Sequence, residues 1–458
     1  MDIEKRSIEF VPHSERYGHP RRLFTIWFSA NMQVTTLVVG TLGIVAGLSL
    51  IWTCIALVLG CVIGTVFMAA HSTQGPHLGI PQMIQSRAQF GVLGAGFPLL
   101  INYLAFVLFT AANGVVMRDS VQAFLDVGDN TAIILFGVVS FIVGFIGYEL
   151  IHRLGALMSA LSGIIFLIVA GLALQQPLPA GAMDVSQGFT LAAFALTVTQ
   201  AASWTLGFGP YVADYSRYLP ANISSRQTFW FSYIGNLLGA GLVMLLGALL
   251  AVLIKDVTSD PGTAIGSFFG PWSKVAMVIV VLGVLEINSL NLYSAYMSFM
   301  TMFTGMRGMT RISRKTKFIA MGLTAIAATW IATATQYNFF AYFSDILIAQ
   351  VYFLVPWSSI NLADFYLVRK GKYSVDAMYD VNGEYGKYSW STMAIFMIGV
   401  LSTVPFMDLS FYHSYFAQMI GTDISWIPAL IVPGGLYYLY NRNRFQSKSP
   451  NMTLQKAA

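Results

Sequence analysis

Residues 281–296, VLGVLEINSLNLYSAY, contain one carboxylate, Glu286, among residues that are otherwise apolar or neutral. Asn288 and Asn291 follow it three residues apart, which places both amides on one face of a helix. A carboxyl group can carry a proton or neutralise a cation, and a carboxamide offers hydrogen-bond donors and acceptors together. Such groups inside an apolar segment indicate an ion pathway or a site for a small polar ligand.

Aromatic and amide side chains recur in other apolar segments. Phe109 and Asn113 are four residues apart and share a helix face, while Gln33 and Trp204 lie in two segments that are rich in small polar residues. Aromatic rings can stack on the faces of a planar ring, and amides can bond to its edges. This set favours a flat nitrogen heterocycle as the ligand. An asparagine in a membrane helix can equally serve interhelical packing, worth about 0.6 kcal/mol, and Phe109 is one of 33 phenylalanines.

The composition indicates that these segments lie in a membrane. Hydrophobic residues make up 56% of the 458 residues and charged residues only 10%, whereas a soluble chain carries about 25% charged residues. The apolar residues form blocks of about 20 residues, the length that a helix needs to cross a hydrocarbon core about 30 Å thick. We therefore predict an all-α polytopic membrane protein with twelve transmembrane helices, over residues 24–49, 51–70, 94–117, 131–148, 154–174, 189–212, 228–254, 275–303, 318–335, 339–366, 391–407 and 424–440.

The distribution of charge predicts the orientation. With an even number of spans both termini lie on one side, and all but three of the 25 Lys and Arg residues fall on that side; the exceptions are Arg118, Lys255 and Lys274. This asymmetry fits the positive-inside rule with both termini in the cytoplasm, so the net charge of +5 does not indicate nucleic acid binding. We expect an integral protein of the plasma (cytoplasmic) membrane. The polar residues 1–23 do not resemble a signal peptide.

Two of the predicted spans contain residues that interrupt a helix. These residues are Ser29, Asn31 and Gln33 in the first span, and Gly207, Gly209 and Pro210 in the sixth. Backbone groups that are freed at membrane depth must face a cavity or a protein partner, and transporters bind their substrate near the midplane at such interruptions. Interruptions five helices apart fit two five-helix repeats of opposite orientation. The alternatives are a hydrogen-bonded packing seam in the first span and a proline kink in the sixth.

Five short motifs along the chain resemble the nucleobase–cation symporter-1 family, in its purine–cytosine permease and hydantoin transporter branch. They are IWFSANMQV from residue 26, SRAQFG from 86, VADYSRYLP from 212, NSLNLYSAY from 288 and NLADFYLVRKGKY from 361. The likeness extends over residues 20–440, nearly the whole chain. It implies a leucine-transporter-like fold, with a 5+5 inverted repeat plus two peripheral helices. It also implies alternating access, driven by sodium ions or protons.

The resemblance further implies which residues contact the substrate. In the sixth span the position is fixed only to within one residue, because counting back from Asp214 places the stacking aromatic of the family at Thr205, directly after Trp204. We accept this shift of one residue and expect Trp204 to stack. The expected substrate-binding residues are then Gln33 in the first span, Phe109 and Asn113 in the third, Trp204 and Thr205 in the sixth, and Asn288 and Asn291 in the eighth.

The resemblance is weaker at the site of the coupling ion. In sodium-coupled relatives, carbonyls of the first span and two small hydroxyl residues of the eighth hold the cation; here Glu286 and Ile287 replace that pair, and Ser289 is the single hydroxyl. An ionised carboxylate in a membrane span costs several kcal/mol, which favours its protonated form. We expect Glu286 to bind a proton, the favoured alternative, or to neutralise Na⁺; a purely structural hydrogen bond to the first span remains open. The cation-coupling residues are Ser29 and Met32, through their carbonyls, with Glu286 and Ser289.

The sequence thus predicts a secondary transporter, and no enzyme, that imports a nucleobase or a related planar nitrogen heterocycle by proton or sodium symport. The alternatives are an amino-acid, amine or vitamin-precursor permease of the same fold, or a membrane-embedded enzyme or sensor. We expect no catalytic residue, metal site, cofactor or protein partner, since the sequence contains no Walker loop, HExxH or GxSxG motif. The expected parts are a cytoplasmic tail, 1–23, a transport core, 24–370, two peripheral helices, 371–440, and a second cytoplasmic tail, 441–458.

Other polar residues have plainer explanations. Asp345 lies near the outer end of the tenth predicted span, where a solvated helix start or a gate is expected. Asp364 and Arg369 are expected at a cytoplasmic helix end, where helix dipole and interface effects explain them. Cys54 and Cys61, seven residues apart in the second span, are expected to pack as free thiols, since that spacing along one helix is too long for a disulfide.

Overall fold

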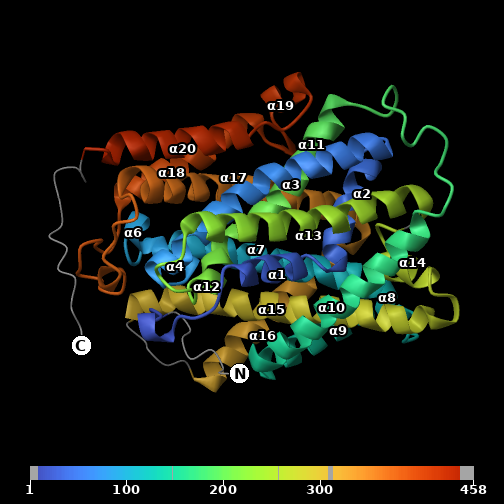
Figure 1. Cartoon of the computed structure of the whole chain (residues 1–458), viewed down its shortest axis with the longest axis horizontal. Coiled ribbons are helices and arrows are strands. Elements are labelled where there is room, and N and C mark those ends of the chain that lie inside the picture. The colour runs from blue at the N-terminus through green and yellow to red at the C-terminus, as the bar shows by residue number, and fades with distance from the viewer. Residues whose placement is uncertain (1–8, 147, 256, 308–312, 444–458) are drawn as a thin grey trace.

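The computed structural model describes residues 9–146, 148–255, 257–307 and 313–443. Thirteen long helices make up most of this part of the chain, and their axes run roughly side by side across Figure 1. They are α1 (Arg21–Ala30), α2 (Val34–Val45), α3 (Leu50–Ser72), α7 (Gly96–Val116), α9 (Asp129–Ile146), α10 (Tyr148–Ala173), α11 (Leu191–Leu206), α13 (Ser225–Leu253), α15 (Ser273–Arg307), α16 (Arg314–Thr335), α17 (Phe339–Leu362), α18 (Trp390–Thr403) and α20 (Trp426–Asn441).

Shorter elements connect these helices. The short α-helices are α4 (Gln74–Leu78), α5 (Gln82–Gln85), α6 (Arg87–Phe90), α8 (Arg118–Gln122), α12 (Val212–Ser216), α14 (Pro261–Ser267) and α19 (Tyr415–Ile420). Single 3₁₀ turns are η1 (His13–Glu15), η2 (Gly209–Tyr211), η3 (Gly270–Trp272), η4 (Gln336–Asn338), η6 (Asp376–Met378) and η7 (Val404–Phe406), and η5 (Ala363–Val368) is a π-helix. Two short antiparallel strands form a hairpin, β1 (Asp408–Leu409) and β2 (Tyr412–His413).

The helices confirm the predicted fold class, because every predicted span contains a helix. Within the described ranges, seven helical stretches are long and apolar enough to cross a membrane, and the bent pair α1–α2 adds an eighth. One of the seven, Arg314–Val368, contains both the ninth and the tenth predicted span, since only the short turn η4 separates α16 from α17. Shorter helices occupy the remaining predicted spans: the apolar segments Leu157–Ala173 and Trp390–Phe406, and α20.

The first span is broken, as its polar residues predict. The axes of α1 and α2 meet at 65°, and Gln33 between them has an extended backbone, with φ −138° and ψ 151°. Side chains replace the helical hydrogen bonds that this break removes: the Asn31 amide donates to the carbonyl of Trp27 at 2.8 Å, and the Gln33 amide donates to the carbonyl of Ala30 at 3.0 Å. The chain thus turns inside the protein without exposing unpaired backbone to lipid.

The interruption in the sixth span is milder than predicted. Helix α11 ends at Leu206, the turn η2 follows with Pro210 inside it, and α12 then continues the same direction to Ser216. Leu191–Ser216 therefore forms one apolar stretch without a sharp bend. The glycines and the proline loosen the helix into a 3₁₀ turn and do not unwind it.

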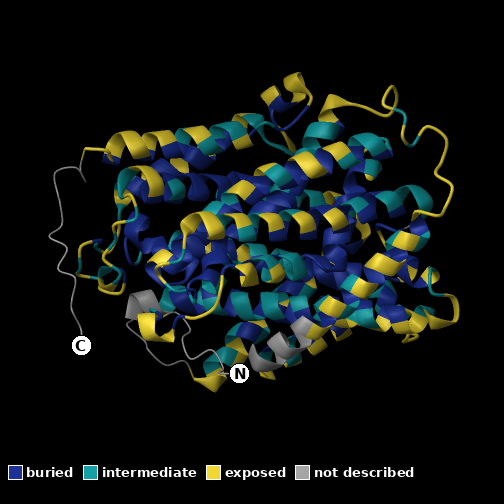
Figure 2. Cartoon of the chain, in the orientation of Figure 1, coloured by how far each residue is buried: buried dark blue, intermediate teal, exposed yellow. Residues whose placement is uncertain are grey.

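Close helix packing holds α2 against α13 and α3 against α11. A methyl group added at Gly40 of α2 would lie 2.0 Å from the carbonyl oxygen of Met244 in α13, and one added at Gly64 of α3 would lie 2.0 Å from that of Ala202 in α11. Small residues let membrane helices approach in this way. Figure 2 shows the buried residues along these inner helices and the exposed ones on the outer faces.

Two other predictions have different outcomes. Cys54 and Cys61 are free thiols, as expected. Asp364 lies just after the end of α17, and it is fully buried within η5. Its carboxylate accepts hydrogen bonds from Gln89, Tyr373 and Tyr437 and pairs with the Arg369 guanidinium at 3.2 Å. This cluster joins α6 and the end of α17 to α20.

The glycine packing yields a stability prediction. We expect Gly40→Ala to lower the free energy of unfolding by about 1–3 kcal/mol, the usual range for overpacking, because backbone atoms of α13 must move. Gly241→Ala on α13 is the matched control, since no atom lies within 4 Å of the added methyl group. Unfolding of both variants in mixed detergent micelles measures the difference. Equal stability of the two variants would contradict this packing.

Candidate ligand-binding site

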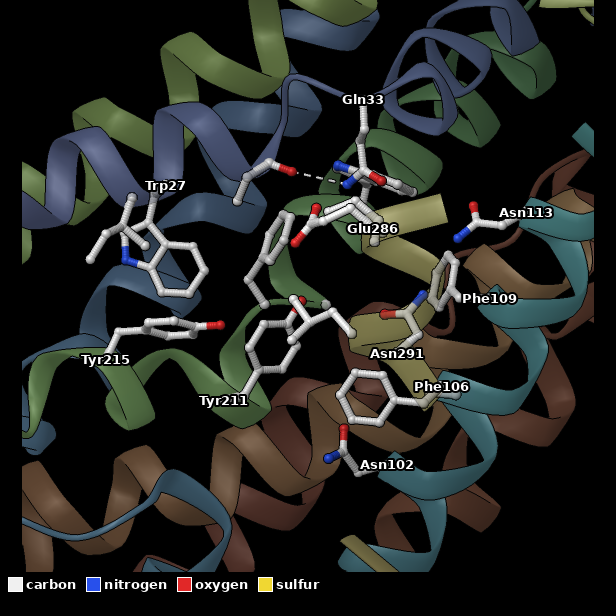
Figure 3. A pocket seen from close by; sticks show the side chains of 18 of the residues that line it. Trp27, Gln33, Asn102, Phe106, Phe109, Asn113, Tyr211, Tyr215, Glu286 and Asn291 are labelled. Atoms are coloured by element: carbon white, nitrogen blue, oxygen red, sulfur yellow. Dashed lines mark hydrogen bonds between the residues drawn. The ribbon is translucent and has the colours of Figure 1, made fainter. Parts of the chain in front are cut away.

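A central cavity lies where the two interrupted spans meet α7, α15 and α17. Its volume is about 300 Å³, at the lower end of the roughly 300–1,000 Å³ that is typical of small-molecule pockets. Most of the wall is apolar and aromatic, with a few amides and one carboxyl group. In Figure 3, labelled side chains from α1, α7 and α15 surround the same space.

Seven of the eleven side chains singled out in the sequence line this cavity. They are Ser29, Gln33, Phe109, Asn113, Trp204, Glu286 and Asn291. The other four do not line it and lie buried behind the wall: Met32, Thr205, Asn288 and Ser289. The structure therefore gathers residues from four predicted spans, the first, third, sixth and eighth, around one space.

The amide of Asn31 ties the break in the first span to the cavity wall. Besides its bond to the α1 backbone, its nitrogen donates to the amide oxygen of Asn236 in α13 at 2.9 Å. Its oxygen accepts from the indole nitrogen of Trp204 in α11 at 3.0 Å. One fully buried carboxamide thus links three helices and fixes the indole.

Two aromatic rings form a corner of the cavity. The rings of Phe109 and Trp204 have centroids 5.8 Å apart and planes at 83° to each other. Trp204 is only 7% exposed, so it lies inside the protein and away from lipid. Because the rings are perpendicular, a flat ligand can stack on one and meet the edge of the other, an arrangement that aromatic groups favour.

Glu286 and Asn291 contribute to the cavity wall polar groups that form no hydrogen bond with any described residue. Glu286 is 7% exposed, and no described residue forms a hydrogen bond or ion pair with its carboxyl group or with the amide of Asn291. None of the described residues that line the cavity is Lys or Arg. Among the described residues, no cluster of His, Cys, Asp and Glu could hold a metal ion. The cavity therefore offers a carboxyl group and a free amide to whatever it binds.

The buried predicted residues support the wall from behind. Asn288 accepts from the Asn113 amide at 3.3 Å and donates to the Ser140 hydroxyl at 3.1 Å. The Ser289 hydroxyl donates to backbone carbonyls at 2.7 and 3.1 Å, and the Thr205 hydroxyl donates to carbonyls of its own helix. These three side chains position α15 and α11.

Helix α17 contributes Gln350 and Leu354 to the cavity wall and is hydrogen-bonded to its neighbours. The hydroxyl of Ser344 in α17 accepts a hydrogen bond from the Gln200 amide of α11 at 2.8 Å, and the backbone carbonyl of Leu347 accepts one from the Ser203 hydroxyl. The Tyr342 hydroxyl donates to the carbonyl of Leu108 in α7 at 3.2 Å. Asp345 of α17 accepts hydrogen bonds from the backbone and side chain of Ser410 in the β1–β2 hairpin. Asp345 thus anchors a loop and does not face the cavity.

Several residues that line the cavity were not predicted from the sequence. Asn102, Tyr211, Tyr215 and Gln350 all contribute to the wall. The spacing of Asn102 held a signal, because it lies seven residues before Phe109 and hence on the same face of α7. The two tyrosines follow Pro210 closely, but only the path of the chain after η2 shows that they face inward.

Comparison with known proteins places this architecture in a family. The family model for permeases of cytosine/purines, uracil, thiamine and allantoin matches residues 10–427. The chain is 40% identical to YxlA of Bacillus subtilis, described as a purine-cytosine permease, over 450 residues, which is 98% of each chain. The purine-cytosine permease fcyB of Emericella nidulans is 30% identical over 58% of this chain and 53% of its own.

Solved structures show the same fold. Mhp1, a nucleobase-cation-symport-1 family transporter, in a closed conformation with bromovinylhydantoin bound, matches with a TM-score of 0.73 at 17% identity, over 97% of each chain. Its inward-facing conformation matches with a TM-score of 0.74. The likeness confirms the predicted leucine-transporter-like fold.

The bond between Asn31 and the indole yields a second stability prediction. We expect Trp204→Phe to lower the free energy of unfolding by about 1–3 kcal/mol, because it leaves the buried amide oxygen of Asn31 without its donor. Trp330→Phe is the matched control, since Trp330 is 70% exposed on the outer face of α16 and should change stability little. The measurement is detergent-induced unfolding of both variants. A similar loss in both would show that the indole nitrogen is not the cause.

Proposed function

Because this chain belongs to the family of permeases for cytosine/purines, uracil, thiamine and allantoin, we propose that it imports a nucleobase or a related planar nitrogen heterocycle by cation symport. The members of the family are permeases, not enzymes. The proposal includes a location in the cytoplasmic membrane with both termini in the cytoplasm. It also includes the inverted-repeat core, residues 24–370, and the peripheral helices of residues 371–440.

The observation that carries this proposal is the perpendicular pair of rings beside the free amide. A planar ring that stacks on Trp204 or Phe109 keeps an aromatic contact on its face. The amide of Asn291 can then donate to and accept from the ring edge at no cost to protein hydrogen bonds, because no described residue occupies it. Gln33 and Asn113 also line the cavity, but their amides already bond to Ala30, Asn288 and Thr35. An aliphatic amino acid would leave the rings without a stacking partner.

Glu286 is the group we propose for coupling. Its carboxyl group lines the cavity and has no described cationic partner, so its charge must be balanced by a bound proton or by a cation. The sodium version has less support, because Ser289 lies behind the wall with its hydroxyl donated to backbone carbonyls, and Met32 is buried away from the cavity. We therefore favour the proton.

Alternating access would then move α17 relative to the rest of the core. Helix α17 is joined to α11 and α7 by hydrogen bonds and by apolar packing that includes Phe343 and Leu347. Each of these hydrogen bonds contributes about 0.5–1.5 kcal/mol. The free energy of substrate binding can offset the loss of a few of them when α17 moves.

The substrate assignment is tested by binding. We expect the purified protein to bind at least one of radiolabelled cytosine, uracil, hypoxanthine and allantoin. We expect Asn291→Ala to weaken that binding about 5- to 150-fold, the equivalent of losing about 1–3 kcal/mol of hydrogen bonding. Asn441→Ala at the end of α20, outside the cavity, serves as the control. Failure of all four compounds to bind would defeat the proposed function.

The coupling assignment is tested by transport in proteoliposomes. We expect Glu286→Gln, a neutral isostere, to abolish accumulation driven by a pH gradient while exchange of internal for external substrate continues, because exchange needs no net movement of charge. Wild-type protein in the same vesicles provides the reference. Accumulation that still follows the pH gradient in Glu286→Gln would exclude this residue as the proton carrier, and accumulation driven by sodium alone would favour the other ion.

A further inference from the structure

A second cavity adjoins the central one, on the side where α5 and α12 lie. Its volume is about 130 Å³, room for about four waters at ~30 Å³ each. The two cavities share five lining residues: Asn102, Phe106, Tyr211, Tyr215 and Leu290. We propose that this second cavity is a transit site, which binds the same planar heterocycle more weakly as it leaves the central cavity; this inference rests on the proposed function.

The strongest support is a stripe of side chains along α7. Asn113, Phe109, Phe106 and Asn102 follow one another at intervals of four, three and four residues, so all lie on one helix face. Figure 3 shows them in this order down one side of the central cavity, with Asn102 at its far end. An amide and an aromatic ring at the central site are thus repeated, in reverse order, about two turns earlier on the same helix.

Asn102 has hydrogen-bonding capacity to spare at this position. It is 5% exposed and lines both cavities. Its nitrogen donates to the hydroxyl of Ser298 on α15 at 3.3 Å, but no donor among the described residues reaches its amide oxygen. This oxygen can therefore accept a hydrogen bond from an N–H group on the edge of a heterocycle.

Aromatic rings mark the boundary between the cavities. Phe106 and Tyr211 have ring centroids 5.7 Å apart, with planes at 41°, and Tyr211 also contacts Phe208 at 5.9 Å. Tyr211 ends the 3₁₀ turn η2, so the interruption of the sixth span places this ring. Phe106 and Tyr211 contact each other, so the two rings must separate before a flat ligand can pass; each ring then offers it a stacking surface.

The opposite wall is polar and comes from α15. Ser294, Ser298 and Thr301 line only the second cavity and lie at intervals of four and three residues on one helix face. Small side chains leave space, and the hydroxyl groups of Ser294 and Ser298 can bond to a ring edge, whereas the Thr301 hydroxyl donates to the carbonyl of Met297 at 2.8 Å. They follow directly after Asn291, so the polar face of α15 continues from the central cavity into the second one. The limited volume suits one flat ring.

The binding stoichiometry tests this proposal. Radiolabelled cytosine and hypoxanthine are the probes, with purified full-length protein in lipid nanodiscs. We expect about two molecules per chain at saturation, with the second dissociation constant at least about tenfold higher than the first. Ser298→Leu fills the second cavity, so it should reduce the stoichiometry to about one and keep the first dissociation constant within about twofold. In proteoliposomes the same variant should slow release of substrate into the lumen.

Two further variants make the result decisive. Thr301→Leu fills the same cavity but leaves the bond between Asn102 and Ser298 intact, so it should act in the same way. Leu282→Phe adds bulk to the lipid-facing side of α15, where Leu282 is 41% exposed, and should change neither site. A single bound molecule per chain in the wild-type protein, or two in Ser298→Leu, would overturn the transit site. Absence of any binding would instead defeat the proposed function itself.

Discussion

The carboxamide of Asn31 is the constraint on which the rest of the site depends. Inside a membrane a helix can break only if other groups satisfy its freed backbone, and this one side chain bonds to the α1 backbone, to Asn236 and to Trp204 together. The break opens the central cavity, and the same amide fixes the indole that forms part of the wall. The Asn31 side chain therefore both stabilises the break in the first span and positions part of the binding surface.

Much of the fold follows from the sequence because the bilayer sets the length of each apolar block. All twelve predicted spans contain helices, and the cluster of Ser29, Asn31 and Gln33 marks the first break correctly. Two features could not be read from the residues. Gly207, Gly209 and Pro210 are compatible with a kink, an unwound turn or the mild 3₁₀ turn that occurs, and only neighbouring helices decide among these. Asp364 lies beside basic residues in the sequence, but the path of α20 buries it.

The site was predictable by helix face and less so by individual residue. Phe109 and Asn113 share a face at the correct spacing and both line the cavity. A step of one residue turns a side chain by about 100° around a helix, which explains why Trp204 lies in the wall and Thr205 behind it. Asn288 supports Asn113 instead of lining the cavity. Tyr211 and Gln350 come from segments whose orientation depends on tertiary packing.

The central claim is that the break held by Asn31 creates a slot for a flat ring. A cryo-electron microscopy map of the protein with a bound heterocycle tests it most directly. The account predicts density for a planar ring against Trp204 or Phe109, with its edge toward Asn291 and with the first span broken at Asn31. A continuous first span, or a ligand bound away from both aromatic rings, would contradict it.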